Sequence, residues 1–255
     1  MADMRSKLNE IYSLEQLSNK DTVIHKIHPL IKIIVSIVYI VCLLMKGRYN
    51  LFGLAPFMFY PIIIMTLAEI PYKAIIKRTF VALPFVIFAG ISNIIFDKEN
   101  LVLFSGVVVT AGVLSFLVLI VRTIFSVTAI LILVATTKFT DLTRQLSIIH
   151  IPMIIVNLIE MIYRYIGVLL EEASTMLTAY RLRNPKYKYP HIKHMGTFVG
   201  HLFLRSIDRA ERIYNAMKCR GYGSKKIEYE NSKTSKKDIF YLIFGTLSSV
   251  IFAII

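Results

Sequence analysis

Two arginines, 37 positions apart, stand near the end of the same short pattern of residues. Segment 179–184 reads Ala-Tyr-Arg-Leu-Arg-Asn, and segment 216–221 reads Ala-Met-Lys-Cys-Arg-Gly. Both end on a residue that tolerates a left-handed backbone, which commonly terminates a helix. Each pattern therefore predicts a helix end that presents an arginine, Arg183 in the first and Arg220 in the second. A guanidinium group can bind a carboxylate in a bidentate pair, so these ends are suited to recognition of an acidic pocket.

The remaining polar residues do not form a catalytic pattern. No metalloprotease, serine-hydrolase, prenyl-transfer or phosphate-loop motif occurs in the sequence. Glu69 and Glu160 are isolated acids and do not make a carboxylate pair for acid and base work. Cys42 lies in an apolar run and Cys219 in a basic one, so we expect neither a disulfide nor a thiolate metal site. We therefore expect no enzyme activity and no cofactor.

Three histidines leave one metal hypothesis open. His191, His194 and His201 have spacings of three and seven, which would place them on one helix face. No acid or cysteine joins them at a suitable spacing, so a solvated or packed surface is favoured over a metal site. The sequence does not decide their role.

Two long amphipathic patterns place the arginine ends. The first runs from Pro152 to Arg183, stops before Pro185, and would be about 48 Å long at 1.5 Å per residue. That length exceeds the hydrocarbon thickness of about 30 Å. The second pattern runs from Met195 to Cys219. Polar residues follow one side and apolar residues the other, so the two helices need each other, or a partner, to cover their apolar stripes.

The rest of the chain is typical of a polytopic membrane protein. Of its 255 residues, 56% are hydrophobic, and the mean hydropathy is +0.62. An all-α fold with about five transmembrane helices is predicted, and two short runs allow an error of one in the count. The candidate spans are Leu30–Met45, Leu51–Ile70, Phe80–Phe96, Ala111–Thr136 and Ile239–Ile255.

The positive charge predicts orientation and not nucleic-acid binding. The net charge is +14, and the stretch from Lys138 to Lys237 holds 18 Lys and Arg against 8 Asp and Glu. These bases adjoin apolar spans, so the positive-inside rule places the N-terminus and this stretch in the cytoplasm, beside the lipid bilayer and any acidic partner. The expected parts are 1–137 with the membrane helices, 138–237 as the cytoplasmic helical segment, and 238–255 as a last span.

Shorter segments yield local expectations. Tyr72 to Arg78 is expected to be a basic connection between spans, and Leu101 to Thr110 a hairpin or a re-entrant piece. Thr140 or Asp141 is a candidate N-cap for a short interfacial helix. Lys32, near a span end, is expected to extend its amine to the membrane surface.

Arg122 falls near the middle of the fourth apolar run. A charge there costs at least about 2.5–3.5 kcal/mol, so the side chain should face protein or water and not lipid. Backbone carbonyls, serine or Asn93 inside the bundle are one set of partners. A contact with another membrane subunit is the alternative.

Several of these segments together resemble a known family. The combination is similar to the transmembrane T component of energy-coupling factor importers, and closest to the CbiQ-like subunit of cobalt importers. The residues that carry the resemblance are His28-Pro29, the run from Ala135 to Asp141, Tyr163-Arg164-Tyr165, Glu171-Glu172-Ala173, the run from Leu202 to Ser206, and the run from Ala216 to Tyr222.

The resemblance implies an architecture and a set of partners. In that family two long cytoplasmic helices cross, and each inserts an Ala-Arg-Gly tip into one of two ATP-binding subunits. The membrane part holds a separate substrate-binding subunit. The matching tips here are Leu182-Arg183-Asn184 and Cys219-Arg220-Gly221, which depart from the family pattern at Leu182, Asn184 and Cys219.

The function implied by the resemblance is non-catalytic coupling of ATP hydrolysis to import. Cobalt is favoured as the substrate by overall resemblance only. Nickel or a vitamin stays open because the ligand would sit in another subunit, and the ATPase pair could be identical or different. A membrane scaffold, a single-subunit channel and a membrane enzyme are the alternatives from other classes.

Overall fold

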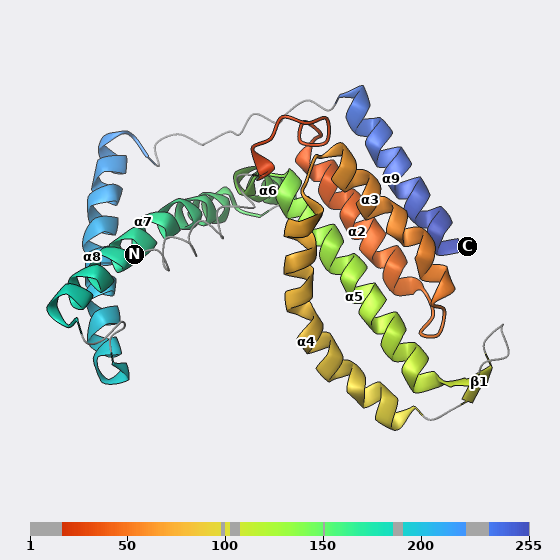
Figure 1. Cartoon of the computed structure of the whole chain (residues 1–255). Coiled ribbons are helices and arrows are strands. Elements are labelled where there is room, and N and C mark those ends of the chain that lie inside the picture. The colour runs from red at the N-terminus through yellow and green to blue at the C-terminus, as the bar shows by residue number, and fades with distance from the viewer. Residues whose placement is uncertain are drawn as a thin grey trace. The chain divides into compact units, whose positions relative to one another are not determined.

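The computed structural model describes residues 17–97, 100–102, 108–149, 151–185, 191–222 and 235–254. They fall into two compact units. The first holds the described residues up to Leu142 together with those from 235 onward, and the second runs from Thr143 to residue 222. Figure 1 shows the elements along the chain. The first unit contains α2 (Pro29–Met45), η1 (Phe52–Met58), α3 (Phe59–Leu67), α4 (Tyr72–Phe96), β1 (Asn100–Val102), β2 (Val108–Thr110), α5 (Ala111–Thr136) and α9 (Lys236–Ile254). The second contains η2 (Leu146–Ile149), α7 (Met153–Arg183) and α8 (Ile192–Cys219), and α6 (Phe139–Gln145) lies at the boundary.

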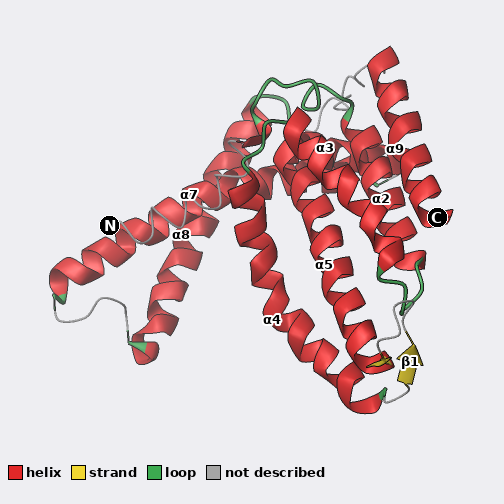
Figure 2. Cartoon of the chain, turned by 45° about the vertical axis from the view of Figure 1, so that its right-hand side comes forward, coloured by secondary structure: helices red, strands yellow, loops and turns green. Residues whose placement is uncertain are grey.

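Helices account for nearly all the secondary structure of the described residues, as expected for an all-α fold (Figure 2). The exception is a two-stranded antiparallel hairpin in which Asn100 pairs with Thr110 and Val102 with Val108. Its strands lie where the sequence allowed a hairpin or a re-entrant piece, so the hairpin alternative is confirmed for the described part of that segment.

Four described helices are long and apolar enough to cross a membrane. Three of them, α4, α5 and α9, match predicted spans. The predicted spans Leu30–Met45 and Leu51–Ile70 form shorter apolar helices, so the count of five is not confirmed. The fourth long helix is α7, which had been assigned to the aqueous segment. Its first half consists mainly of aliphatic residues, so part of this helix is as long and as apolar as a membrane span.

Two helices begin earlier than predicted. Helix α4 starts at Tyr72, so the expected basic connection Tyr72–Arg78 is its first two turns. Pro71 precedes it, and the Pro71 carbonyl accepts the Ala74 N–H at 3.0 Å. Helix α6 starts at Phe139, because the N–H groups of Asp141 and Leu142 both donate to the Lys138 carbonyl at 3.0 Å. Lys138, and neither Thr140 nor Asp141, is therefore the N-terminal cap residue.

Lys32 is buried, with 2% of its surface exposed, so the expectation that it reaches the membrane surface was wrong. Its Nζ donates to the Thr136 carbonyl at 2.8 Å and to the His25 carbonyl at 3.2 Å. Thr136 is the last residue of α5, whose terminal carbonyls have no partner inside the helix. Burial and the charge of Lys32 lower the pKa of His25, whose ring contacts the Thr22 hydroxyl and the Leu17 carbonyl.

Helices α2 and α9 pack side by side in parallel (Figures 1 and 2), and the residues that meet at their N-terminal ends, His28 and Asp238, are 210 positions apart in the sequence. The N–H of His28, which caps α2, donates to Asp238 Oδ1 at 3.0 Å, and Ser235 N–H donates to Asp238 Oδ2 at 2.7 Å. Two turns further along, a Cβ added at Gly245 would lie 2.6 Å from Val35 Cγ1. The buried Asp238 carboxylate therefore serves two helix N-termini at once, and Gly245 permits the close approach below it.

An aromatic cluster joins these helices to η1 and α3. The Tyr39 ring stacks on Tyr60 with 4.4 Å between centroids and meets the edge of Phe57 at 5.6 Å. The Tyr39 hydroxyl donates to the Phe57 carbonyl at 2.8 Å. Pro61 has no N–H, so it cannot give that carbonyl the bond expected four residues along a helix. Tyr39 supplies this donor from a neighbouring helix.

A double-mutant cycle tests this replacement. Tyr39→Phe keeps the ring but leaves the buried Phe57 carbonyl without this donor, so we expect a loss of about 1–3 kcal/mol in the free energy of unfolding. In a Pro61→Ala background, the backbone N–H that the substitution introduces can donate to the Phe57 carbonyl in place of the Tyr39 hydroxyl. Tyr39→Phe should therefore lower the free energy of unfolding by less in that background. Denaturant titration of the purified chain in detergent measures both. Equal losses in the two backgrounds would refute the role given to Pro61.

Candidate functional site

Helix α8 ends as its sequence predicts. Gly221 has φ = 81°, in the left-handed region that glycine adopts without strain. Its N–H donates to the Lys218 carbonyl at 2.9 Å, and the Tyr222 N–H donates to the Met217 carbonyl at 3.0 Å. This pair of bonds ends the helix at Cys219, with Arg220 as the C-cap residue.

Helix α7 ends differently. Asn184 has φ = −131° and ψ = 74°, so the predicted left-handed terminus is wrong at this position. The cause is Pro185, whose ring disfavours the α region for the residue before it and extends that residue's backbone. The Asn184 N–H still closes the last turn on the Tyr180 carbonyl at 2.9 Å.

All six predicted tip residues are exposed. These are Leu182, Arg183 and Asn184 on α7, and Cys219, Arg220 and Gly221 on α8. Leu182 is 80% exposed, which places an apolar side chain beside Arg183 at the surface. Each helix end thus presents an exposed arginine.

Helices α7 and α8 contact each other through an ion-pair cluster centred on one carboxylate (Figure 2). The Glu172 carboxylate of α7 accepts a hydrogen bond from Arg205 and another, at 3.2 Å, from Arg209. These two arginines lie one turn apart on α8. Glu172 precedes Arg183 by 11 residues, and Arg209 precedes Arg220 by 11 residues. At 1.5 Å per residue, Arg183 lies about 16 Å along α7 from Glu172, and Arg220 lies about 16 Å along α8 from Arg209 and about 22 Å from Arg205.

Large apolar side chains remain exposed on both helices beyond this contact. The exposed set includes Ile154, Ile155, Leu158, Ile162 and Ile166 on α7, and Val199, Phe203, Leu204, Ile207 and Tyr214 on α8. The two helices therefore do not cover each other's apolar stripes. Of the two expectations for these stripes, mutual coverage is not met by the exposed residues, and coverage by a partner stays a prediction.

The three histidines are exposed near the start of α8. His191 is the N-cap residue, and its carbonyl accepts the His194 N–H at 2.8 Å. Within the described ranges, no group of three His, Cys, Asp or Glu side chains is placed to hold a metal ion.

Arg122 bonds to backbone carbonyls, as the first of its two predicted alternatives requires. Its Nη2 donates to the Lys46 carbonyl at 2.6 Å and to the Gly47 carbonyl at 3.4 Å. Lys46 is the C-cap of α2, so the guanidinium lies at the negative end of that helix dipole. Ser115 and Asn93 line the adjacent cavity of about 220 Å³, together with Arg48 and Asp97.

Sequence reasoning missed the role of Glu172 and of Asp238. Glu172 was noted only within a resembling motif, and the signal that could have found it is the pair of arginines four residues apart on the other helix. Asp238 gave a weaker signal, an acid in the first turn of an apolar helix.

The helices and comparison with known proteins define the class: a multi-pass membrane protein that is a component of a transport system. Residues 20–230 match the family model described as CbiQ, cobalt transport protein, and the chain belongs to this family. It is also similar to two proteins of Methanocaldococcus jannaschii. "Uncharacterized protein MJ1571" is 25% identical over 94% of this chain and 85% of the relative. "Uncharacterized protein MJ1089" is 27% identical over 92% of this chain and 90% of the relative.

Removal of the Arg122 side chain should destabilise the first unit. Arg122→Leu leaves the Lys46 and Gly47 carbonyls without this donor, and we expect a loss of about 1–3 kcal/mol in the free energy of unfolding, measured by denaturant titration in detergent. Arg122→Lys should retain part of it. Arg48→Leu is the matched control, because it removes the same charge from the same cavity. If Arg122→Leu has the same free energy of unfolding as the wild type, the contact of Arg122 with these carbonyls is not required for stability.

Loss of the Glu172 carboxylate should loosen the contact between α7 and α8. Glu172 is 22% exposed and its partners are 59% and 39% exposed, so we expect a cost of only about 0.5 kcal/mol, or about twofold faster amide exchange in α8. Hydrogen exchange with mass spectrometry measures this for Glu172→Gln. Glu171→Gln is the control at the adjacent position, and an equal effect there would contradict the assignment to Glu172.

Proposed function

We propose that the chain is the coupling subunit of an energy-coupling factor importer. Two ATP-binding subunits would receive the tips of α7 and α8, and the membrane helices would hold a separate substrate-binding subunit. The observation that carries the proposal is the pair of exposed arginine ends on two long helices joined by one ion-pair contact, in a chain of the CbiQ family. The chain itself would not hydrolyse ATP.

The chemistry of the tips supports docking into acidic pockets. An arginine at a helix C-terminus is favoured by the helix dipole, so each helix stabilises the charge it presents. A carboxylate in the partner would bind the guanidinium at two points, which lysine cannot reproduce. Two similar ends on one chain imply two similar pockets, and a pair of like subunits is the simplest source of these.

The contact at Glu172 provides a pivot for the proposed coupling. With both tips held, a closing motion of the ATP-binding subunits would move the two ends together. Because the contact lies about 16 Å from Arg183 and about 16–22 Å from Arg220, the two arms would be of similar length. Arg144 also pairs with Glu160 at 3.3 Å, which ties the first half of α7 to the end of α6. Movement of α7 would thereby reach the segment that follows α5.

Orientation and substrate are further parts of the proposal. The bases between Lys138 and Lys237 support a cytoplasmic location for the N-terminus and for segment 138–237 between the membrane parts 1–137 and 238–255. Cobalt is proposed from the family, with nickel or a vitamin as alternatives. Uptake in cells that also carry the matching binding subunit would distinguish the substrates.

Substitution of the tips tests the coupling role. The chain is expressed with its ATP-binding and substrate-binding subunits, and the purified complex is assayed for retained ATP-binding subunits and for uptake. Arg183→Ala or Arg220→Ala should lower uptake more than assembly, since one arm would still be held. The double substitution should abolish assembly, and lysine at either position should not restore full uptake.

Arg212→Ala is the matched control, because it removes an exposed arginine from α8 away from the tip. It should behave like the wild type. If the double tip variant keeps its ATP-binding subunits and transports normally, the coupling assignment is wrong and a scaffold role replaces it.

A further inference from the structure

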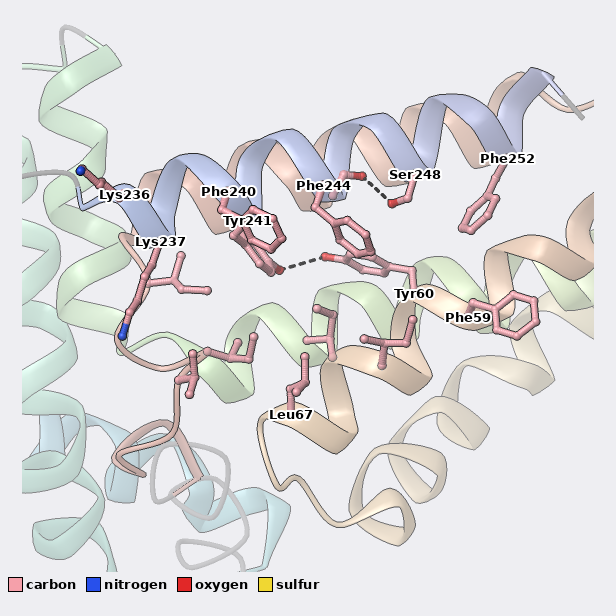
Figure 3. Close-up of a pocket in the computed structure, with 16 residues that line it drawn as sticks. Phe59, Tyr60, Leu67, Lys236, Lys237, Phe240, Tyr241, Phe244, Ser248 and Phe252 are labelled. Carbon is pink, nitrogen blue, oxygen red and sulfur yellow. Dashed lines mark hydrogen bonds between the residues drawn. The ribbon is translucent and has the colours of Figure 1, made fainter.

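We propose that the groove between α3 and α9 binds an anionic phospholipid, with one acyl chain in the groove and the phosphate against Lys236 and Lys237. The groove has a volume of about 470 Å³ and is visible in Figure 3. It lies within the first unit, and the helix ends assigned to coupling belong to the second.

The lining of the groove fits a hydrocarbon chain. Side chains from both helices contribute, including Ile63 and Leu67 on α3 and Phe240 and Phe244 on α9. The few hydroxyl groups are already engaged. Ser248 Oγ donates to the Gly245 carbonyl at 3.1 Å, and the hydroxyls of Tyr60 and Tyr241 lie 3.5 Å apart. Among the described residues that line it, the interior therefore offers no free hydroxyl that would select a polar ligand.

The charge at one end of the groove fits an anionic headgroup. Lys236 and Lys237 lie in the first turn of α9, at the end opposite Phe252 (Figure 3). Both lysines are exposed. The adjacent Asp238 is buried, and its two oxygens accept backbone N–H groups of His28 and Ser235, so it is engaged inside the fold. Two lysines at the rim of an apolar groove attract an anionic lipid.

The length of the groove also favours a lipid over a partner helix. From Lys236 to Phe252, α9 rises about 24 Å. One leaflet, from headgroup to chain end, is about 20–22 Å, half of a bilayer of about 40–45 Å. A second helix packed along the groove would need apolar cover across about 30 Å of hydrocarbon, which is longer than the groove.

Lipid binding to the purified full-length chain tests the proposal. Phosphatidylglycerol and phosphatidylcholine with identical acyl chains are added in mixed micelles, and bound lipid is measured by native mass spectrometry. The wild type should prefer phosphatidylglycerol. Lys236→Gln and Lys237→Gln should each reduce that preference by about fivefold. Ser248→Trp, which fills the groove with an indole ring, should reduce binding of both lipids.

Lys73→Gln and Lys77→Gln, made one at a time, are the control, since each removes one positive charge from the start of α4 and neither lysine lines the groove. Circular dichroism verifies that each variant keeps its helices. The proposal is overturned if the wild type binds both lipids equally, or if the control lowers the preference as much as the groove variants. It is also overturned if Ser248→Trp leaves lipid binding intact and instead blocks association with a membrane partner, which would assign the groove to a protein.

Discussion

The first unit depends on two hydrogen-bonded contacts between α2 and α5. In each contact, a cationic side chain of one helix binds carbonyls at the C-terminal end of the other helix. Lys32 near the start of α2 binds the last carbonyl of α5, and Arg122 of α5 binds the carbonyls at the end of α2. The two contacts are separated by 14 residues on each helix, from 32 to 46 and from 122 to 136. Each cation thus lies at the negative end of the other helix and satisfies carbonyls that would otherwise lack donors in an apolar surrounding. An antiparallel pair with this register has little freedom to slide.

The other membrane elements are positioned relative to this pair. Helix α9 joins α2 through Asp238 and the close approach at Gly245. Helix α4 joins α5, where a Cβ at Gly112 would lie 2.6 Å from the carbonyls of Asn93 and Asp97. Tyr39 on α2 completes the backbone bonding of η1. The contacts of Asp238 and Tyr39 satisfy backbone groups at a helix end and beside a proline, and satisfying such groups is the main requirement that a bilayer imposes on a fold.

Sequence patterns predicted the parts of this architecture that depend on local chemistry. The end of α8 follows from Gly221, and the need of Arg122 for polar partners follows from its position in an apolar run. The end of α7 was mispredicted because Pro185 overrode the tolerance of Asn184 for a left-handed backbone. The contacts of Lys32, Asp238 and Glu172 could not be read from the sequence, since each depends on a residue of another helix brought near only by folding. The extent of α4 was underestimated because its first two turns are basic, and hydropathy marks only the apolar part of a helix.

The ion pairs of α7 bear on which part of that helix could lie in a bilayer. By composition its first half could enter one, and its exposed isoleucines would then face lipid. Glu172 and its two arginine partners retain substantial exposure, and a charged side chain at the bilayer centre costs at least about 2.5–3.5 kcal/mol. The contact between α7 and α8, and with it both arginine tips, is therefore far more stable in water or at a protein surface than in hydrocarbon. The same helix is thus apolar where it begins and charged where it meets α8, so a bilayer that accepts its first half would exclude the part that carries Glu172.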